Sequence, residues 1–113
     1  MDKTNYLKGM KLLREFRKLD SEMPIQMASV FLRVTMQPGI TIKELMTLED
    51  ISQSSASRNV AALSDWNRAR KAGHGLIQAV EDPYERRRKI VTLTPKGKRV
   101  AATMNEILSC EES

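Results

Sequence analysis

The sequence predicts a single, mainly α-helical domain with a small β-hairpin. Its 113 residues fit one domain, residues 1–113, because a domain typically has about 100 to 200 residues. Apolar residues recur at every third or fourth position in several segments, which is the spacing of amphipathic helices. Only two short runs, GLIQAV and KIVTLT, have the composition of strands, and they are close enough in sequence to pair as a hairpin.

Two helices are expected in the N-terminal third. From Lys3 to Asp20, cations alternate with apolar residues at helical spacing, which predicts an amphipathic helix over residues 1–20. A second helix is expected over residues 24–37, because Pro24 suits a first helical position and Pro38-Gly39 ends the pattern. Its apolar residues cover more than one stripe, which predicts a central place in the core. They include Ile25, Met27, Ala28, Val30, Phe31, Leu32 and Val34.

The next segment predicts two helices joined by a tight turn. Thr41 suits an N-cap and Glu44 its capping-box partner, opening a short helix that ends near Leu48 or Glu49. The turn is Asp50-Ile51-Ser52, after which Ser52 or Ser54 caps the second helix. In that helix three apolar residues at spacings of four and three must face inward: Ala56, Val60 and Leu63.

The opposite face of this second helix is polar and has no carboxylate before Asp65. Short polar or basic side chains can approach phosphates and base edges without repulsion. The face therefore indicates nucleic-acid binding, although a capped and solvated helix start is the simpler alternative. Its residues are Gln53, Ser54, Ser55, Ser57, Arg58 and Asn59.

The predicted hairpin has a long, basic tip. The segment EDPYERRR separates the two strand-like runs, and four cations follow one another at its end: Arg86, Arg87, Arg88 and Lys89. The nearby acidic residues Glu81, Asp82 and Glu85 must pair with some of these cations. If these cations contact phosphates, the affinity for nucleic acid should fall steeply as the salt concentration rises. A solvated basic loop would give no such dependence.

A last helix is expected after the hairpin. Thr94-Pro95 should open this helix, residues 95–110, and its apolar stripe includes Val100, Met104 and Ile107.

Composition and charge restrict the possible functions. The net charge of +5 and pI of about 9.6 favour an anionic partner. One histidine, His74, and one cysteine, Cys110, exclude a multi-His or Cys-cluster metal site, and no nucleophile–base pair is present, so we expect neither an enzyme nor a cofactor. Without an apolar run of about 18 residues or a signal-peptide h-region, a cytoplasmic protein with no membrane partner is expected.

The segment between the second helix of the pair and the hairpin allows two interpretations. DWNRARKAGHG either continues the helix as far as Lys71 or forms an irregular loop. Its basic residues Arg68, Arg70 and Lys71 surround Trp66, which either packs under the hairpin or stacks on a base. Cys110 is expected to be inert.

Helices, a helix-turn-helix and then a basic hairpin are the order of a winged helix-turn-helix. The segments ITIKELMTLEDISQSSASRNVAAL and GLIQAVEDPYERRRKIVTLTPKGKRV resemble the multiple antibiotic resistance regulator (MarR) family of bacterial transcription factors. The resemblance implies that residues 52–64 are the recognition helix and that the hairpin, residues 75–94, is the wing. It also implies that Glu85 braces the wing by pairing with a neighbouring Arg and that Arg87 reaches the minor groove.

The sequence departs from the family pattern at several places. Asp50 replaces the usual Gly of the turn, and Leu48-Glu49 are in the reverse of the usual polar-apolar order. The linker between Leu63 and Gly75 is longer, and one helix follows the wing where the family has a longer helical pair. These features lead us to expect a shortened regulator of phage or plasmid type, with no diagnostic residues for a small-molecule effector.

The sequence therefore favours a homodimeric, sequence-specific DNA-binding regulator, most simply a repressor. The recognition helix, residues 52–64, and the wing tip, residues 81–89, would read an inverted repeat in double-stranded DNA. Residues 24–94 would form the winged core, and the helices over residues 1–20 and 95–110 the dimer contact, unless a monomer packs both apolar stripes internally. The alternatives are a winged-helix adaptor that contacts transcription or replication machinery, and a replication or DNA-packaging factor.

Overall fold

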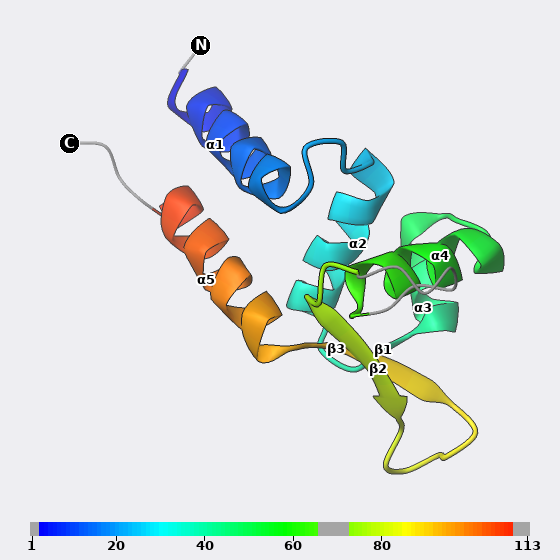
Figure 1. Cartoon of the computed structure of the whole chain (residues 1–113). Helices are drawn as coiled ribbons and strands as arrows, with labels where there is room; N and C mark the ends of the chain where they lie inside the picture. Colours follow the sequence, from blue (N-terminus) through cyan, green and yellow to red (C-terminus); the bar gives the residue numbers. More distant parts are fainter. Residues whose placement is uncertain (1–2, 66–72, 110–113) are drawn as a thin grey trace.

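The computed structural model describes residues 3–65 and 73–109 and is a mainly α-helical winged helix-turn-helix, as expected (Figure 1). Five residues with expectations from the sequence, Trp66, Arg68, Arg70, Lys71 and Cys110, lie outside the described part. Within that part, no helix is long and apolar enough to cross a membrane. The elements, in chain order, are α1 (Lys3–Leu19), α2 (Ile25–Met36), β1 (Ile40–Thr41), α3 (Ile42–Glu49), α4 (Gln53–Leu63), β2 (Ile77–Glu81), β3 (Lys89–Leu93) and α5 (Pro95–Ser109).

Helix α2 is central, as its apolar pattern predicts. Val30, Phe31 and Val34 are fully buried, and the ring of Phe31 meets that of Phe16 edge-on at 6.0 Å between centroids. Ile25 does not belong to this core, because it is the first residue of the helix and is 84% exposed. Pro24 lies one position earlier than expected: it is the N-cap, with an extended backbone, and not the first helical residue.

The predicted caps of the helix-turn-helix are confirmed. The Thr41 hydroxyl accepts a hydrogen bond from the Glu44 N–H, while the Glu44 carboxylate accepts one from the Thr41 N–H at 3.1 Å. This reciprocal bonding lowers the pKa of Glu44, chiefly through the Thr41 backbone N–H and then its hydroxyl. At α4, the Ser52 hydroxyl accepts from the Ser55 N–H at 3.1 Å. Both helix starts are thus satisfied by local side chains.

The two departures from the family turn have local structural reasons. Asp50 adopts the left-handed conformation, with φ 52° and ψ 54°, which Gly reaches most easily and Asp also tolerates. A sharp turn between α3 and α4 is therefore possible without Gly. The reversed Leu48-Glu49 order leaves Leu48 46% exposed and turns the Glu49 carboxylate inward. There the carboxylate accepts hydrogen bonds from two residues of α2, from Ser29 Oγ and, at 2.9 Å, from Arg33 Nε.

A three-stranded antiparallel sheet in the order β1-β3-β2 carries the wing. Strands β2 and β3 form the predicted hairpin, with Ile77 opposite Leu93 and Glu81 opposite Lys89. Strand β1 pairs Ile40 with Val91 and was not predicted, because it has only two residues and ends in the N-cap of α3. It joins the helix-turn-helix to the base of the wing (Figure 1).

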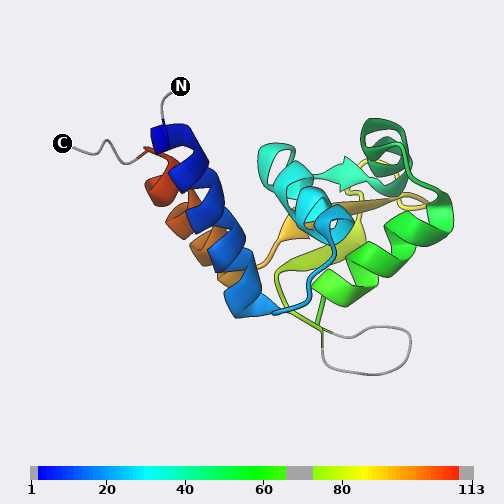
Figure 2. The same cartoon turned by 90° about the horizontal axis from the view of Figure 1, so that it is seen from above.

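Helices α1 and α5 lie side by side at one end of the molecule, and the wing extends at the other (Figures 1 and 2). Phe16 of α1 and Met104 of α5 are buried in the common core. The base of α5 is fixed to the wing, because the Thr94 hydroxyl donates to the Gly75 carbonyl at 2.6 Å and accepts from the Gly97 N–H at 3.0 Å. Gly97 is buried directly against the backbone of Leu76.

Replacing Gly97 with Ala should destabilise the protein by about 1–3 kcal/mol, as expected for overpacking. A Cβ at this position would lie 1.9 Å from the Leu76 carbonyl oxygen, which is backbone and cannot turn aside. The matched control is Gly9→Ala within α1, where a Cβ meets nothing within 4 Å and should stabilise the helix by about 0.5–1 kcal/mol. Urea unfolding of both variants measures the two effects; equal or same-sign shifts would contradict this packing.

Candidate nucleic-acid interface

Helix α4 presents one polar face to solvent. Ala56 and Leu63 are fully buried and Val60 is 7% exposed, so the inner row predicted from the sequence is confirmed. On the outer side, Gln53, Ser54 and Arg58 are exposed, whereas Ser55 and Ser57 are half-buried. The face available to a partner is therefore narrower than the sequence suggests and is concentrated in the first turns of the helix.

Arg58 is held over the start of α4 by a cluster of hydroxyls. Ser52 Oγ lies 3.1 Å from both Ser54 Oγ and Ser55 Oγ, and Arg58 Nη2 donates to Ser55 Oγ at 3.3 Å. The guanidinium retains other N–H groups that these contacts do not use. The backbone N–H groups of the first turn carry the positive end of the helix dipole, so cation and dipole favour an anion at the same place.

Asn59 was expected on the polar face, and this prediction is wrong. The residue is 7% exposed, and its side-chain Nδ2 donates to Gln26 Oε1 on α2 at 2.8 Å. Helical spacing explains the position, because Asn59 lies three residues after Ala56 and next to Val60 on the inner row. A polar residue on the inner side of a helix, among Ala56, Val60 and Leu63, indicates a buried hydrogen bond to a neighbouring helix. The spacing of Asn59 in the sequence already indicated this position.

The tip of the wing is organised around the buried carboxylate of Asp82. This carboxylate accepts hydrogen bonds from Arg88 Nε at 3.0 Å and Nη2 at 2.7 Å and from the Tyr84 N–H at 2.9 Å. The Asp82 N–H in turn donates to the Arg88 carbonyl at 2.9 Å and closes the loop. The Tyr84 N–H and then the Arg88 guanidinium lower the pKa of Asp82, and Asp82 raises the pKa of Arg88.

The expected brace through Glu85 is therefore wrong. Glu85 is exposed, its carboxylate forms no ion pair with the described residues, and it contributes its backbone carbonyl, which accepts from the Arg88 N–H at 3.0 Å. Asp82 takes the role because it directly follows β2, while Arg88 directly precedes β3, so the two residues face each other across the base of the loop. Asp82, at the base of the loop, therefore closes the hairpin, and Glu85, in the middle of the tip, does not.

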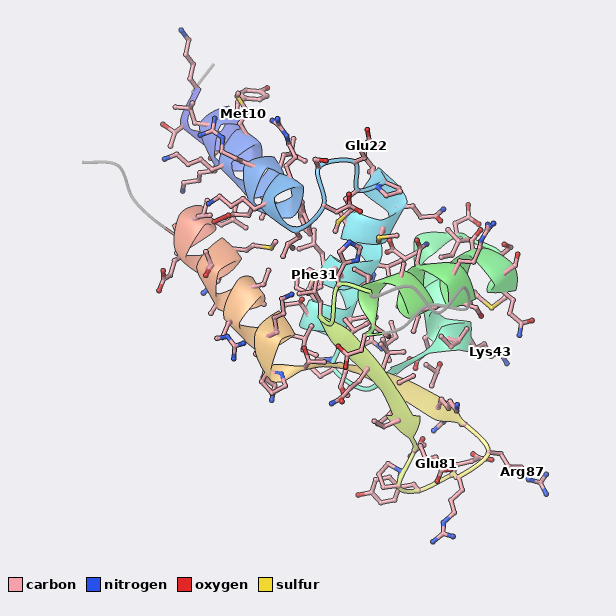
Figure 3. The ribbon with its side chains drawn as sticks, viewed as in Figure 1. Met10, Glu22, Phe31, Lys43, Glu81 and Arg87 are labelled. Carbon is pink, nitrogen blue, oxygen red and sulfur yellow. The ribbon has the colours of Figure 1, made fainter. Side chains whose placement is uncertain are left out.

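The other wing cations remain exposed. Arg86, Arg87 and Lys89 are free of ion pairs with the described residues, and Figure 3 shows Arg87 extending away from the loop. Arg88 differs, because its guanidinium is bound to Asp82 although the residue is exposed. Tyr84, which was not among the residues expected at the site, is 96% exposed at the tip, and its backbone N–H is fixed by the Asp82 carboxylate. An aromatic residue within a polar, basic tip was the available signal.

His74, the one histidine of the sequence, bridges two helices. Its Nδ1 lies 2.9 Å from the Ala62 carbonyl of α4 and its Nε2 3.2 Å from Asp20 Oδ2 at the end of α1. The ring therefore links α4 to the helix pair at the other end of the molecule.

Solved structures with the same fold include transcriptional regulators of the MarR family. RV1404 from Mycobacterium tuberculosis is 20% identical, with a TM-score of 0.69 over 92% of this chain and 65% of that chain. The MepR–DNA complex of S. aureus is 16% identical, with a TM-score of 0.70 over 90% and 76%. BldR from Sulfolobus solfataricus is 23% identical, with a TM-score of 0.63 over 88% and 64%. The chain thus has the MarR-like winged helix fold and spans about two thirds of the length of these proteins.

No protein-family model matches the sequence, and no curated protein matches it.

Asp82→Asn should loosen the wing tip, whereas Glu85→Gln should leave it ordered. The Asp82 pKa is lowered in the folded protein, so the brace is complete above the ordinary carboxyl pKa of about 3.9 and is lost as the pH falls through the lower, folded-state value. The amide signals of Tyr84 and Arg88, followed by NMR from pH 7 to pH 2, should move together with this titration. Equal loosening in Glu85→Gln, or an unchanged tip in Asp82→Asn, would contradict the assignment.

Proposed function

We propose that this chain is a sequence-specific DNA-binding transcriptional regulator, acting as a homodimeric repressor on an inverted repeat. The observation that carries the proposal is the pairing of one exposed polar helix face with a braced, cation-tipped hairpin on the same body. A major groove about 12 Å wide admits one helix, and the wing can then follow the neighbouring strand. The S. aureus structure in complex with DNA has this fold and supports the assignment.

In this proposal α4 reads the bases. Arg58 binds guanine with two hydrogen bonds or grips a phosphate, and Gln53 pairs with adenine. Ser54 is exposed and can serve either a base or a phosphate, whereas the half-buried Ser55 and Ser57 contribute at closer range. Ser55 also positions Arg58 through the 3.3 Å hydrogen bond.

The wing supplies backbone and minor-groove contacts. Arg87 enters the minor groove, and Arg86 and Lys89 neutralise phosphates. Arg88 keeps the tip in shape through Asp82 and adds charge. Tyr84, exposed on a fixed backbone, is placed to pack against the sugar-phosphate edge.

The dimer in this proposal uses the outer apolar stripe of α1. Helices α1 and α5 pack on each other through their inner faces, but Tyr6, Leu7, Met10 and Leu13 are 44–60% exposed. Leu108 of α5 is 43% exposed. A continuous exposed apolar stripe is characteristic of an interface, and a two-fold axis would place two α4 helices roughly 34–36 Å apart, one DNA turn.

Arg58→Ala and Arg87→Ala test DNA binding by α4 and the wing. Each loss should cost about 1–3 kcal/mol of binding free energy, and each lost phosphate contact should reduce the slope of log affinity against log salt by about one. Titration of a duplex selected from random fragments by the purified protein measures both quantities. Lys98→Ala on α5 is the control. Unchanged affinity and slope in both Arg variants would favour a protein-interaction adaptor instead.

Met10→Glu and Leu13→Glu should convert the dimer into monomers, since two buried carboxylates per interface would lack partners. Sedimentation equilibrium measures the dissociation constant, which should rise at least tenfold. Ile25→Glu is the matched control, because Ile25 is 84% exposed outside the stripe. A wild-type monomer, or a dimer insensitive to both changes, would contradict this interface.

A further inference from the structure

The imidazole ring of His74 lies between the ends of α1 and α4. Its Nδ1 is 2.9 Å from the carbonyl oxygen of Ala62, in the last turn of α4, and its Nε2 is 3.2 Å from Oδ2 of Asp20, directly after α1. The side chain is only 18% exposed, so these two oxygens and not water are its main partners. Figure 2 shows that α1 and α4 belong to different parts of the molecule, and the ring joins their C-terminal ends.

Both partners of the ring are hydrogen-bond acceptors. A backbone carbonyl and a carboxylate accept hydrogen bonds and donate none. A neutral imidazole has one N–H, so it can donate to Ala62 or to Asp20 but leaves a lone pair facing the other oxygen. The protonated ring has an N–H on each nitrogen and can donate to both. The two distances therefore fit the protonated ring, and loss of its proton removes one of the two hydrogen bonds.

Further hydrogen bonds hold both acceptors in place. The Ala62 carbonyl also accepts from the backbone N–H of His74 at 3.0 Å. The second carboxylate oxygen of Asp20 accepts from the Glu22 N–H at 3.0 Å, and the Asp20 N–H donates to the Phe16 carbonyl at 3.0 Å. Neither oxygen can therefore turn away from a neutral ring without breaking other contacts.

Charged groups from three elements surround the ring, and they act in both directions. On the α1 side, Asp20 pairs with the ring, and Arg17 lines the same hollow as Asp20. At the end of α4, Asp65 Oδ1 lies close to the backbone of the residue that follows His74. From α5, Lys96 Nζ donates to the His74 carbonyl at 3.0 Å. The two carboxylates favour a charged ring and the two cations oppose it, so the direct contacts of the ring decide.

The two charge states of the ring exchange in an accessible pH range. Histidine ordinarily changes charge between about pH 5 and pH 8, where carboxylates are ordinarily ionised. On the acid side of this range the charged ring donates to the Asp20 carboxylate through a charge-assisted hydrogen bond. On the alkaline side that bond or the one to Ala62 is lost. Because the sequence has one histidine, no second histidine contributes to the effect.

We propose that protonation of His74 fixes the end of α4 to the end of α1 and thereby raises the affinity of the dimer for DNA as the pH falls. The inference rests on the proposed function, in which α1 forms the dimer contact and α4 reads the bases. The distance between the two α4 helices then depends on how firmly each is held to its own α1. A fixed distance of one DNA turn allows both half-sites to be bound together at a lower ordering cost.

The first test compares the affinity for the selected duplex at pH 5.5 and pH 7.5 at constant salt. The wild type should bind at least threefold more tightly at pH 5.5. His74→Gln, whose side chain does not titrate, should bind equally at both. Asp20→Asn supplies an N–H that can donate to the unprotonated Nε2, so its affinity should differ by less than twofold between the two pH values. The matched control is Glu106→Gln, an exposed carboxylate on α5, which should keep the wild-type pH dependence.

The second test uses the wild type without DNA and does not depend on how well the variants fold. The ring ¹⁵N signals of His74, followed by NMR from pH 8 to pH 5, should show protonation of both nitrogens. The amide signals of residues 20, 62 and 74 should move with the same titration, because they belong to the two contacts of the ring.

Two results would overturn the inference. One is a pH dependence of DNA affinity in the wild type that is no larger than in His74→Gln or that persists in Asp20→Asn. The other is a ring that stays neutral down to pH 5. A protein that binds no duplex at either pH, although its ring titrates and moves the amides of residues 20 and 62, shows instead that the proposed function has failed.

Discussion

The buried row of α4 determines which face of this helix can meet a partner. Ala56, Val60 and Leu63 pack into the core, and the hydrogen bond from Asn59 to Gln26 fixes the rotation of α4 against α2. Since a helix has only one face left when the other is buried, Gln53, Ser54 and Arg58 must face solvent. A rotation of α4 by a quarter turn would bury Arg58 without a partner, at a large desolvation cost.

Helix α4, the wing and the helix pair α1–α5 are connected by short, specific contacts. Gly97 allows the start of α5 to touch the backbone of Leu76, and the Thr94 hydroxyl joins the same two segments. His74 adds a link between the end of α4 and the end of α1. A partner that moves α1 relative to α5 would therefore shift the base of the wing and α4. Through these contacts, the proposed dimer contact could change the affinity for DNA.

Local features were predictable from the sequence, and contacts between distant residues were not. The Thr41–Glu44 capping box, the Ser52 cap and the hairpin depend on neighbours within a few residues, so spacing alone predicts them. Strand β1 and the inward turn of Glu49 depend on β3 and α2, which the sequence does not place nearby. At the candidate site, spacing identified the outer face of α4, but choosing Asp82 over Glu85 required the register of the hairpin.

The central claim is that α4 and the wing form one surface that meets duplex DNA. The most direct measurement is the change in amide NMR signals when a duplex selected by the protein is added in dilute buffer. The account predicts the largest shifts at residues 52–58 and 84–89, with small shifts in the buried half of α2. Shifts confined to other elements, or none at stoichiometric duplex, would contradict it.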